Sequence, residues 1–117
     1  MTDTIDIDHL KSWIGREEEA VDRIDARLVR SLRATLGEEP GDPVPGDEAP
    51  PCAHWSLAPP IVANDRTGPD GHPARGGFLP PVPLPRRMWA GGHIAFHAPL
   101  AVGDEVVRRS RIGSVDL

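Results

Sequence analysis

The sequence predicts an α+β protein, and three observations carry this prediction. Residues 26–36 have an apolar face at the helical period and begin and end at recognisable signals. Residues 88–97 and 105–116 are rich in alternating apolar side chains, which is typical of strands. Residues 38–86 form a long loop rich in proline and glycine, because these residues interrupt both helices and sheets.

A first helix is expected at about residues 8–14. Asp6 or Asp8 can cap its beginning, and Gly15 can end it. Trp13 lies on the apolar face of this helix, so we expect its side chain to anchor the helix on the core.

The helix at 26–36 has the clearest signals in the sequence. Asp25 is a good N-cap and Gly37 a good C-terminal stop. Its apolar face consists of Leu28, Val29, Leu32 and Leu36. Three arginines lie off this face, and they are interpreted as a solvated basic face or as a phosphate-binding patch: Arg27, Arg30 and Arg33.

The stretch before that helix has two interpretations. Three consecutive glutamates at 17–19 would suit the start of a helix, whereas residues 20–24 have the composition of a short edge strand. The strand is the favoured interpretation.

Within the loop, residues 52–58 are expected to form a short helix with Trp55 and Leu57 as apolar anchors. Residues 61–75 contain the turn dipeptides Gly68-Pro69 and Asp70-Gly71. Because long irregular segments in compact domains are usually functional, a functional role is expected for this loop.

The two C-terminal strands are expected to differ in regularity. Residues 88–97 alternate, with Gly91 and Gly92 interrupting the run. In the second strand, arginines at 108, 109 and 111 disturb the alternation, which indicates a bulge or a strand that leaves the core. These elements are too few to close a sheet over a helix, so we expect strands from further C-terminal sequence or another chain to complete it.

Length and composition limit the number of domains, the kinds of partner and the compartment that are expected for this protein. The 117 residues suit one domain, 1–117, and the net charge of −5 disfavours nucleic-acid binding. Cys52 is the sole cysteine, so no internal disulfide can form and a reducing compartment is expected. With no signal peptide and no apolar run of membrane-spanning length, we expect a cytoplasmic protein without membrane partners.

Four ordered motifs resemble the N-terminal half of the MaoC-like two-domain hot-dog acyl-thioester dehydratases and hydratases, including the hydroxyacyl-thioester dehydratases of type 2 and the mesaconyl-CoA and itaconyl-CoA hydratases. The motifs are Asp70-Gly71-His72-Pro73; Gly77-Phe78-Leu79-Pro80-Pro81; Leu84-Pro85-Arg86-Arg87-Met88-Trp89-Ala90-Gly91-Gly92; and Pro99-Leu100-Ala101-Val102-Gly103-Asp104-Glu105-Val106. The resemblance implies a partial hot-dog, in which an antiparallel sheet wraps around a central helix.

The resemblance also implies an activity, the reversible hydration of an enoyl thioester. In the family the acid/base pair lies in a Gly-Asp-x-Asn-Pro-x-His segment of the C-terminal hot-dog, and this segment is absent from the 117 residues. No catalytic residue is therefore assigned, and no cofactor is expected. The implied function is the N-terminal part of an enoyl- or 3-hydroxyacyl-thioester hydratase that shapes the acyl pocket and braces a catalytic hot-dog. The alternative is a stand-alone, non-catalytic acyl-CoA-binding subunit that pairs with a separately encoded hot-dog.

Arg87, Trp89 and His93 are the candidates for lining or bracing the acyl pocket. In the competing structural interpretation, Arg86 or Arg87 pairs with a carboxylate or carbonyl and Trp89 is a core residue. No metal site is expected, since two histidines four apart on a strand are separated by about 13 Å. The expected partners are an acyl-CoA or acyl-carrier thioester and a second hot-dog domain or subunit.

Overall fold

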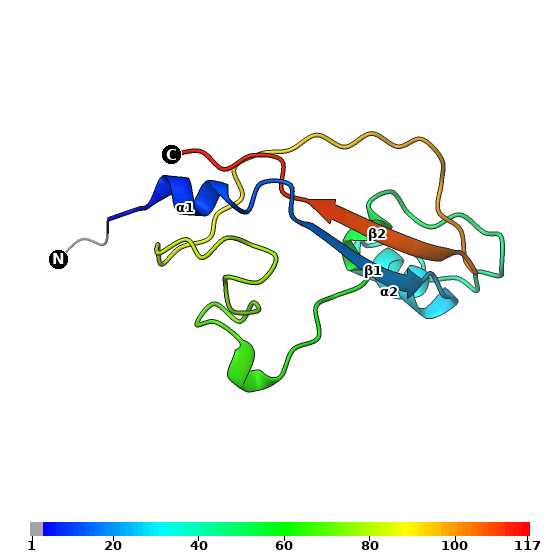
Figure 1. The fold of residues 1–117 in the computed structure, drawn as a ribbon. Helices are drawn as coiled ribbons and strands as arrows, with labels where there is room; N and C mark the ends of the chain where they lie inside the picture. The colour runs from blue at the N-terminus through cyan, green and yellow to red at the C-terminus, as the bar shows by residue number, and fades with distance from the viewer. Residues whose placement is uncertain (1–3) are drawn as a thin grey trace. The chain divides into compact units, whose positions relative to one another are not determined.

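The computed structural model describes residues 4–117, and it contains few regular elements. In chain order these are α1 (Ile7–Lys11), β1 (Glu17–Arg23), α2 (Ala26–Thr35), the 3-10 helices η1 (Ala53–Ser56) and η2 (Asn64–Arg66), and β2 (Glu105–Arg111) (Figure 1). The chain divides into two compact units. The first unit contains the described residues up to 19, together with 60–91 and 109–117; the second unit contains 20–59 and 92–108.

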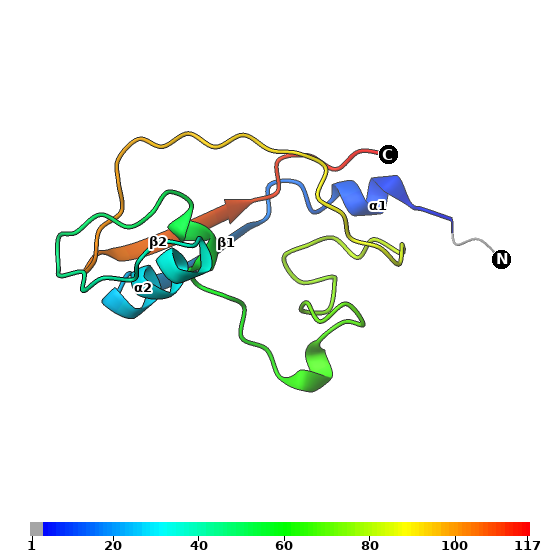
Figure 2. The same cartoon turned by 180° about the vertical axis from the view of Figure 1, so that it is seen from behind.

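β1 and β2 form a two-stranded antiparallel sheet and lie side by side in Figures 1 and 2. The Ile24 N–H donates to the Asp104 carbonyl over 3.0 Å, and the Gly103 N–H donates to the Ile24 carbonyl over 2.8 Å. The strand interpretation of the stretch before α2 is therefore confirmed, and the strand includes the three glutamates.

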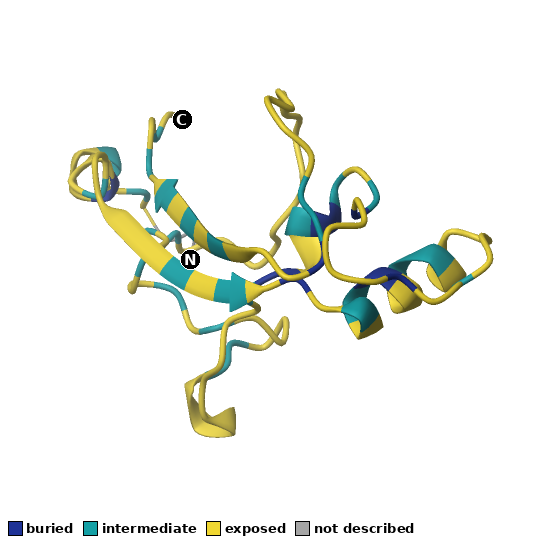
Figure 3. Ribbon diagram, turned by 90° about the vertical axis from the view of Figure 1, so that its right-hand side faces the viewer, coloured by how far each residue is buried: buried dark blue, intermediate teal, exposed yellow. Residues whose placement is uncertain are grey.

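The side chains of β2 alternate between an exposed face and a half-buried face along the whole strand, as the bands in Figure 3 show, whereas β1 alternates only after its three exposed glutamates. β2 keeps this alternation from end to end, so the bulge expected from its arginines does not occur. On the exposed face, cross-strand ion pairs join Arg23 to Glu105 over 3.0 Å and Arg109 to Glu19 over 2.7 Å. Arg108 lies on the other face, where its guanidinium donates to the Ala58 carbonyl, just after η1.

α2 begins and ends as the sequence predicts, to within one residue. The Asp25 carboxylate accepts the Leu28 N–H over 2.7 Å, a cap that contributes about 1 kcal/mol. At the other end Gly37 has φ +79°, and the Glu38 N–H reaches back to the Arg33 carbonyl over 2.9 Å. This is the C-terminal hydrogen bonding that a left-handed glycine permits.

Two of the three arginines of α2, Arg27 and Arg30, are exposed, in agreement with a solvated basic face, and Arg33 is half-buried. Arg30 Nε donates to the Gly41 carbonyl and an Arg33 guanidinium nitrogen to the Pro40 carbonyl, each over 3.0 Å. Both side chains therefore hold the loop that follows the helix.

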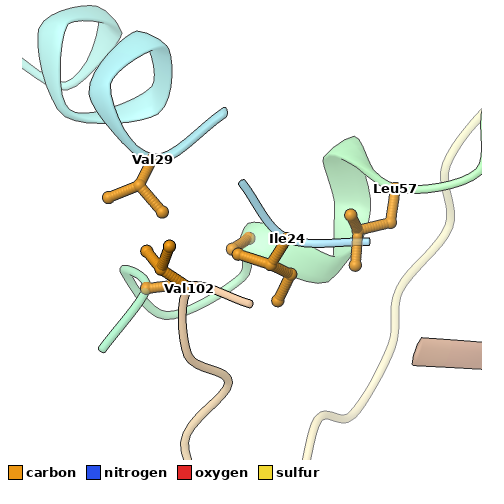
Figure 4. Packing of buried hydrophobic residues seen from close by; sticks show 6 residues of the cluster. Ile24, Val29, Leu57 and Val102 are labelled. Atoms are coloured by element: carbon orange, nitrogen blue, oxygen red, sulfur yellow. The ribbon is translucent and has the colours of Figure 1, made fainter. Parts of the chain in front are cut away.

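A small apolar core lies within the second unit. Its largest fully buried side chains are Ile24 and Val29, and Figure 4 shows these two with Leu57 and Val102 pointing toward one another. Val29 comes from the predicted face of α2, and Leu28 and Leu32 of that face pack against the core. Leu36 is exposed, because the helix ends beside it.

α1 is shorter than expected and its tryptophan has a different role. Asp6 caps the helix by accepting the His9 N–H over 3.1 Å, and residues after Lys11 continue as tighter turns up to Gly15. Trp13 is half-buried and is not a core anchor. Its indole N–H donates to the Gly77 carbonyl over 3.0 Å, and Arg16 stacks over the indole ring at 4.5 Å.

The strand predicted at residues 88–97 does not form. The segment is extended, but among residues 4–117 no strand pairs with it, and a β-ladder requires a hydrogen-bonded neighbour. Its apolar side chains are consequently exposed, with Met88 and Trp89 each at 81% and Phe96 at 60%. The other predicted strand ends at Arg111 rather than 116, just before Gly113.

Residues 38–86 are mainly loop, as predicted, with η1 and η2 inside it. The expected turn is present: Gly71 has φ +82°, its N–H donates to the Gly68 carbonyl, and the Asp70 carboxylate accepts the His72 N–H. None of the helices among residues 4–117 has the length and apolar character needed to cross a bilayer.

Candidate functional site

The larger cavity of the second unit has a volume of about 470 Å³ and lies between residues 48–54 and 96–100. A single antiparallel bridge between Glu48 and Ala101 brings these two segments together, and the Ala49 N–H donates to the Leu100 carbonyl over 2.7 Å. The segments are thus fixed by their backbones, and their side chains surround the cavity. Most of the lining is apolar, and this size is within the range of small-molecule sites.

In addition to Glu48, three residues with polar side chains line this largely apolar cavity: Cys52, His54 and His97. Cys52 precedes η1 in the left-handed conformation, with φ +67°, and this turns the chain so that η1 can begin. The His54 ring lies 6.3 Å from the Phe96 ring in an edge-to-face arrangement. The cavity can therefore enclose an apolar group and offers imidazoles as polar partners.

A second cavity of about 310 Å³ lies between the half-buried face of the sheet and η1. Ala20, Leu57 and Val106 contribute apolar walls. The Arg108 guanidinium donates to the Ala58 carbonyl over 3.1 Å, and the Asp22 carboxylate accepts the Ala58 N–H over 2.6 Å. These two strand residues hold the end of η1 over the sheet.

The same contact affects the protonation of Asp22. The Ala58 N–H, and then the Arg23 N–H, stabilise the carboxylate and lower the pKa of Asp22 below its usual value of 3.8. Asp22 is thus an ionised hydrogen-bond acceptor at neutral pH, and its role at the end of η1 is structural.

In the first unit, two arginines, Arg75 and Arg87, hold residues 70–87. An Arg75 guanidinium nitrogen donates to the Val82 carbonyl over 2.6 Å and also to the Leu84 carbonyl. Arg87 Nε lies 3.5 Å from an Asp70 carboxylate oxygen. The His72 N–H, and to a smaller extent Arg87, lowers the pKa of Asp70, so this carboxylate is ionised at neutral pH.

The predicted substrate-lining residues are placed as follows. Arg87 and Trp89 belong to the first unit, and His93 belongs to the second. Arg87 is paired with Asp70, as the structural interpretation of this arginine supposed. Trp89 and His93 are both exposed, so the interpretation of Trp89 as a core residue is wrong. Their role in substrate binding stays a prediction.

Sequence reasoning missed the residues that line the cavities. His54 follows Cys52 closely in the sequence, but among residues 4–117 no group of three His, Cys, Asp or Glu side chains could hold a metal ion. Arg75 was also missed. One signal for it was available, because residues 80–85 contain four prolines, and a segment so poor in N–H groups needs outside donors for its carbonyls.

Comparison with known proteins identifies the family. Residues 52–117 match the family described as hydroxyacyl-thioester dehydratase type 2. This match covers more than half of the sequence and includes η1, β2 and the candidate substrate-lining residues Arg87, Trp89 and His93. The chain belongs to this family, and its two-stranded antiparallel sheet with few helices is a partial hot-dog.

A curated relative agrees with this membership. The chain is 40% identical over 104 residues to the mesaconyl-C(4)-CoA hydratase of Chloroflexus aurantiacus. The matching region covers 89% of this chain and 37% of that protein. The chain thus spans little more than a third of the length of the curated relative that it matches.

Proposed function

We propose that this chain is the N-terminal part of an enoyl- or 3-hydroxyacyl-thioester hydratase. In this proposal it shapes the acyl pocket and braces a catalytic hot-dog that the 117 residues do not contain, whether that hot-dog is on the same polypeptide or on another. The observation that carries the proposal is the family match over residues 52–117, together with 40% identity to a mesaconyl-C(4)-CoA hydratase.

The chemistry of the chain supports a binding role. Hydration of an enoyl thioester needs an acid/base pair for the water and the alpha proton, and donors for the developing enolate oxygen. The family's acid/base segment is absent from the sequence. The apolar cavities instead suit the acyl group of a thioester, whether its carrier is CoA or an acyl carrier protein.

The small size of the sheet supports the part of the proposal in which a second hot-dog pairs with this chain. Within residues 4–117 it has two strands, whereas two-stranded sheets are marginal by themselves. Exposed Met88, Trp89 and Phe96 provide apolar surface beside extended backbone. A second hot-dog that adds strands and covers these side chains would account for both features.

A stand-alone acyl-CoA-binding subunit is the second candidate function. One observation favours it: both cavities of the second unit are lined entirely by residues of that unit. Binding of an acyl group there would need no other chain.

A chimera tests the main proposal. The chain replaces the matching 104-residue region of the Chloroflexus hydratase, and hydration of mesaconyl-C(4)-CoA is followed by the loss of enoyl-thioester absorbance. We expect the chimera to turn over substrate and the isolated 117-residue chain to show no turnover. Trp89→Ala in the chimera should lower kcat/KM, while Val21→Ala, on the exposed face of β1, serves as the matched control.

Two results would decide against the proposal. Full turnover by the isolated chain would mean that it holds its own catalytic residues. An inactive but folded chimera, combined with tight binding of acyl-CoA by the isolated chain, would favour the stand-alone binding subunit.

A further inference from the structure

The two cavities of the second unit share two lining side chains, those of His54 and Leu100. All other residues that line one cavity are absent from the lining of the other. These two residues therefore border both spaces, which have volumes of about 470 Å³ and about 310 Å³.

The backbone that carries His54 is firmly anchored. Its neighbour Ala53 is 1% exposed and Leu57, at the end of η1, is 5% exposed, so both belong to the core of the second unit. The Leu57 N–H donates to the His54 carbonyl over 3.2 Å. A substitution at His54 therefore changes the lining of both cavities without removing a residue that anchors η1.

The His54 ring itself lies among aromatic neighbours. It is 5.6 Å from the Trp55 ring and 6.3 Å from the Phe96 ring. The ring is half-buried, and Phe96 lies on the side of the larger cavity. His54 thus borders both spaces, with an aromatic neighbour on the side of the larger one.

We propose that His54 limits the length of the acyl group that this chain accepts. This inference rests on the proposed function, because it assumes that the larger cavity takes the acyl chain. An acyl group enters the larger cavity, and its far end meets the wall formed by His54 and Leu100. Without the imidazole, the two cavities join, and a longer chain extends past η1 toward the half-buried face of the sheet.

The test measures dissociation constants of the full chain for saturated acyl-CoAs of four, eight and twelve carbons by isothermal titration calorimetry. Wild type should bind the four-carbon compound best. His54→Ala should bind the eight- or twelve-carbon compound about tenfold more tightly than wild type does, because burying a few additional methylenes contributes that much. Its affinity for the four-carbon compound should change little.

His54→Phe and Trp55→Ala are the matched controls. Phenylalanine keeps a planar ring of similar size, so His54→Phe should keep the wild-type length preference. Trp55 lines neither cavity and is 66% exposed, so Trp55→Ala should also bind like wild type. Circular dichroism and the unfolding midpoint establish that each variant is folded. If His54→Ala does not fold, Leu100→Val opens the same wall from its other residue and should shift the preference in the same direction.

Three results would overturn the inference. They are an unchanged length preference in a folded His54→Ala protein, an equal loss of affinity for all lengths, and a His54→Phe protein that behaves like His54→Ala. The last would mean that the imidazole acts through its chemistry and not its bulk. If wild type binds none of the acyl-CoAs, the inference about His54 fails, whereas the proposed function is decided by the turnover of the chimera, so the two failures are distinguishable.

Discussion

The two units are stabilised in different ways. In the second unit, side chains from β1, α2, η1 and the turn before β2 converge on one apolar cluster with Ile24 and Val29 at its centre. In the first unit, Leu10 is the one buried hydrophobic residue among those described. There the chain is held by side-chain donors on backbone carbonyls, from Trp13 and Arg16 to Gly77 and from Arg75 to Val82.

The sequence explains this difference. Residues 60–91 contain seven prolines and five glycines, and prolines have no N–H with which to form a ladder or a helix. Carbonyls in such a segment need donors from elsewhere, and an arginine has five on a long stem. The second unit has the apolar helical face and the strand that permit ordinary packing. Three predictions test the comparison, from the largest expected effect to the smallest.

Ile24→Ala should lower the free energy of unfolding by about 2–5 kcal/mol, because it leaves a cavity at the centre of the apolar cluster. Chemical denaturation followed by circular dichroism measures the change. Val21→Ala on the same strand is the control. Val21 is 71% exposed, so the cost should be within about 0.5 kcal/mol. Equal costs for the two variants would contradict the assignment of the core.

Arg75→Met should loosen the first unit locally and leave global stability nearly unchanged. Losing the donor to the Val82 and Leu84 carbonyls should cost about 1.4 kcal/mol, so trypsin should cleave the native protein after Arg86 or Arg87 about tenfold faster. Arg66→Met in the same unit is the matched control and should leave that rate unchanged. A large fall in global stability with no change in cleavage would show that Arg75 acts on the fold as a whole.

Acid should weaken both units through one aspartate each. The pKa values of Asp22 and Asp70 are lowered from 3.8, so the fold favours their ionised forms. Their contribution to stability is present above pH 3.8 and is lost as the pH falls below this value through the lowered pKa. Carboxylate titration by NMR measures both values.

Substitution of each aspartate by asparagine distinguishes the acid sensitivity of one unit from that of the other. Asp70→Asn should reduce the acid-induced rise in amide hydrogen exchange of residues 71–88, while Asp22→Asn should leave that rise intact. If Asp22→Asn abolished it, the acid sensitivity of this segment would originate in the second unit.

The sequence predicts best where local interactions decide the structure. The helix between Asp25 and Gly37 was predicted to within a residue, because its cap, apolar period and stop act within a few residues of one another. The strand at 88–97 was predicted from its alternation alone. Alternation shows which side chains a strand could bury, but a ladder also needs a neighbour, and none is present among the described residues.

The candidate site could be predicted only in part, for the same reason. The resemblance to a family directed attention to Arg87, Trp89 and His93, whose motif is contiguous. His54 and Leu100 are 46 positions apart, and the bridge between Glu48 and Ala101 brings their segments together. No local sequence pattern predicts that these two segments pair. In the same way, none predicts that the Trp13 indole N–H donates to the Gly77 carbonyl.

The donors that hold residues 77–84 bind main-chain oxygens, which every amino acid possesses. These hydrogen bonds do not depend on the side chains of Leu79, Val82 and Leu84. We therefore expect that these side chains can be exchanged without a change in the path of the backbone. A library that randomises Leu79, Val82 and Leu84 while keeping Arg16 and Arg75 could thus vary the chemistry of this surface on a fixed backbone.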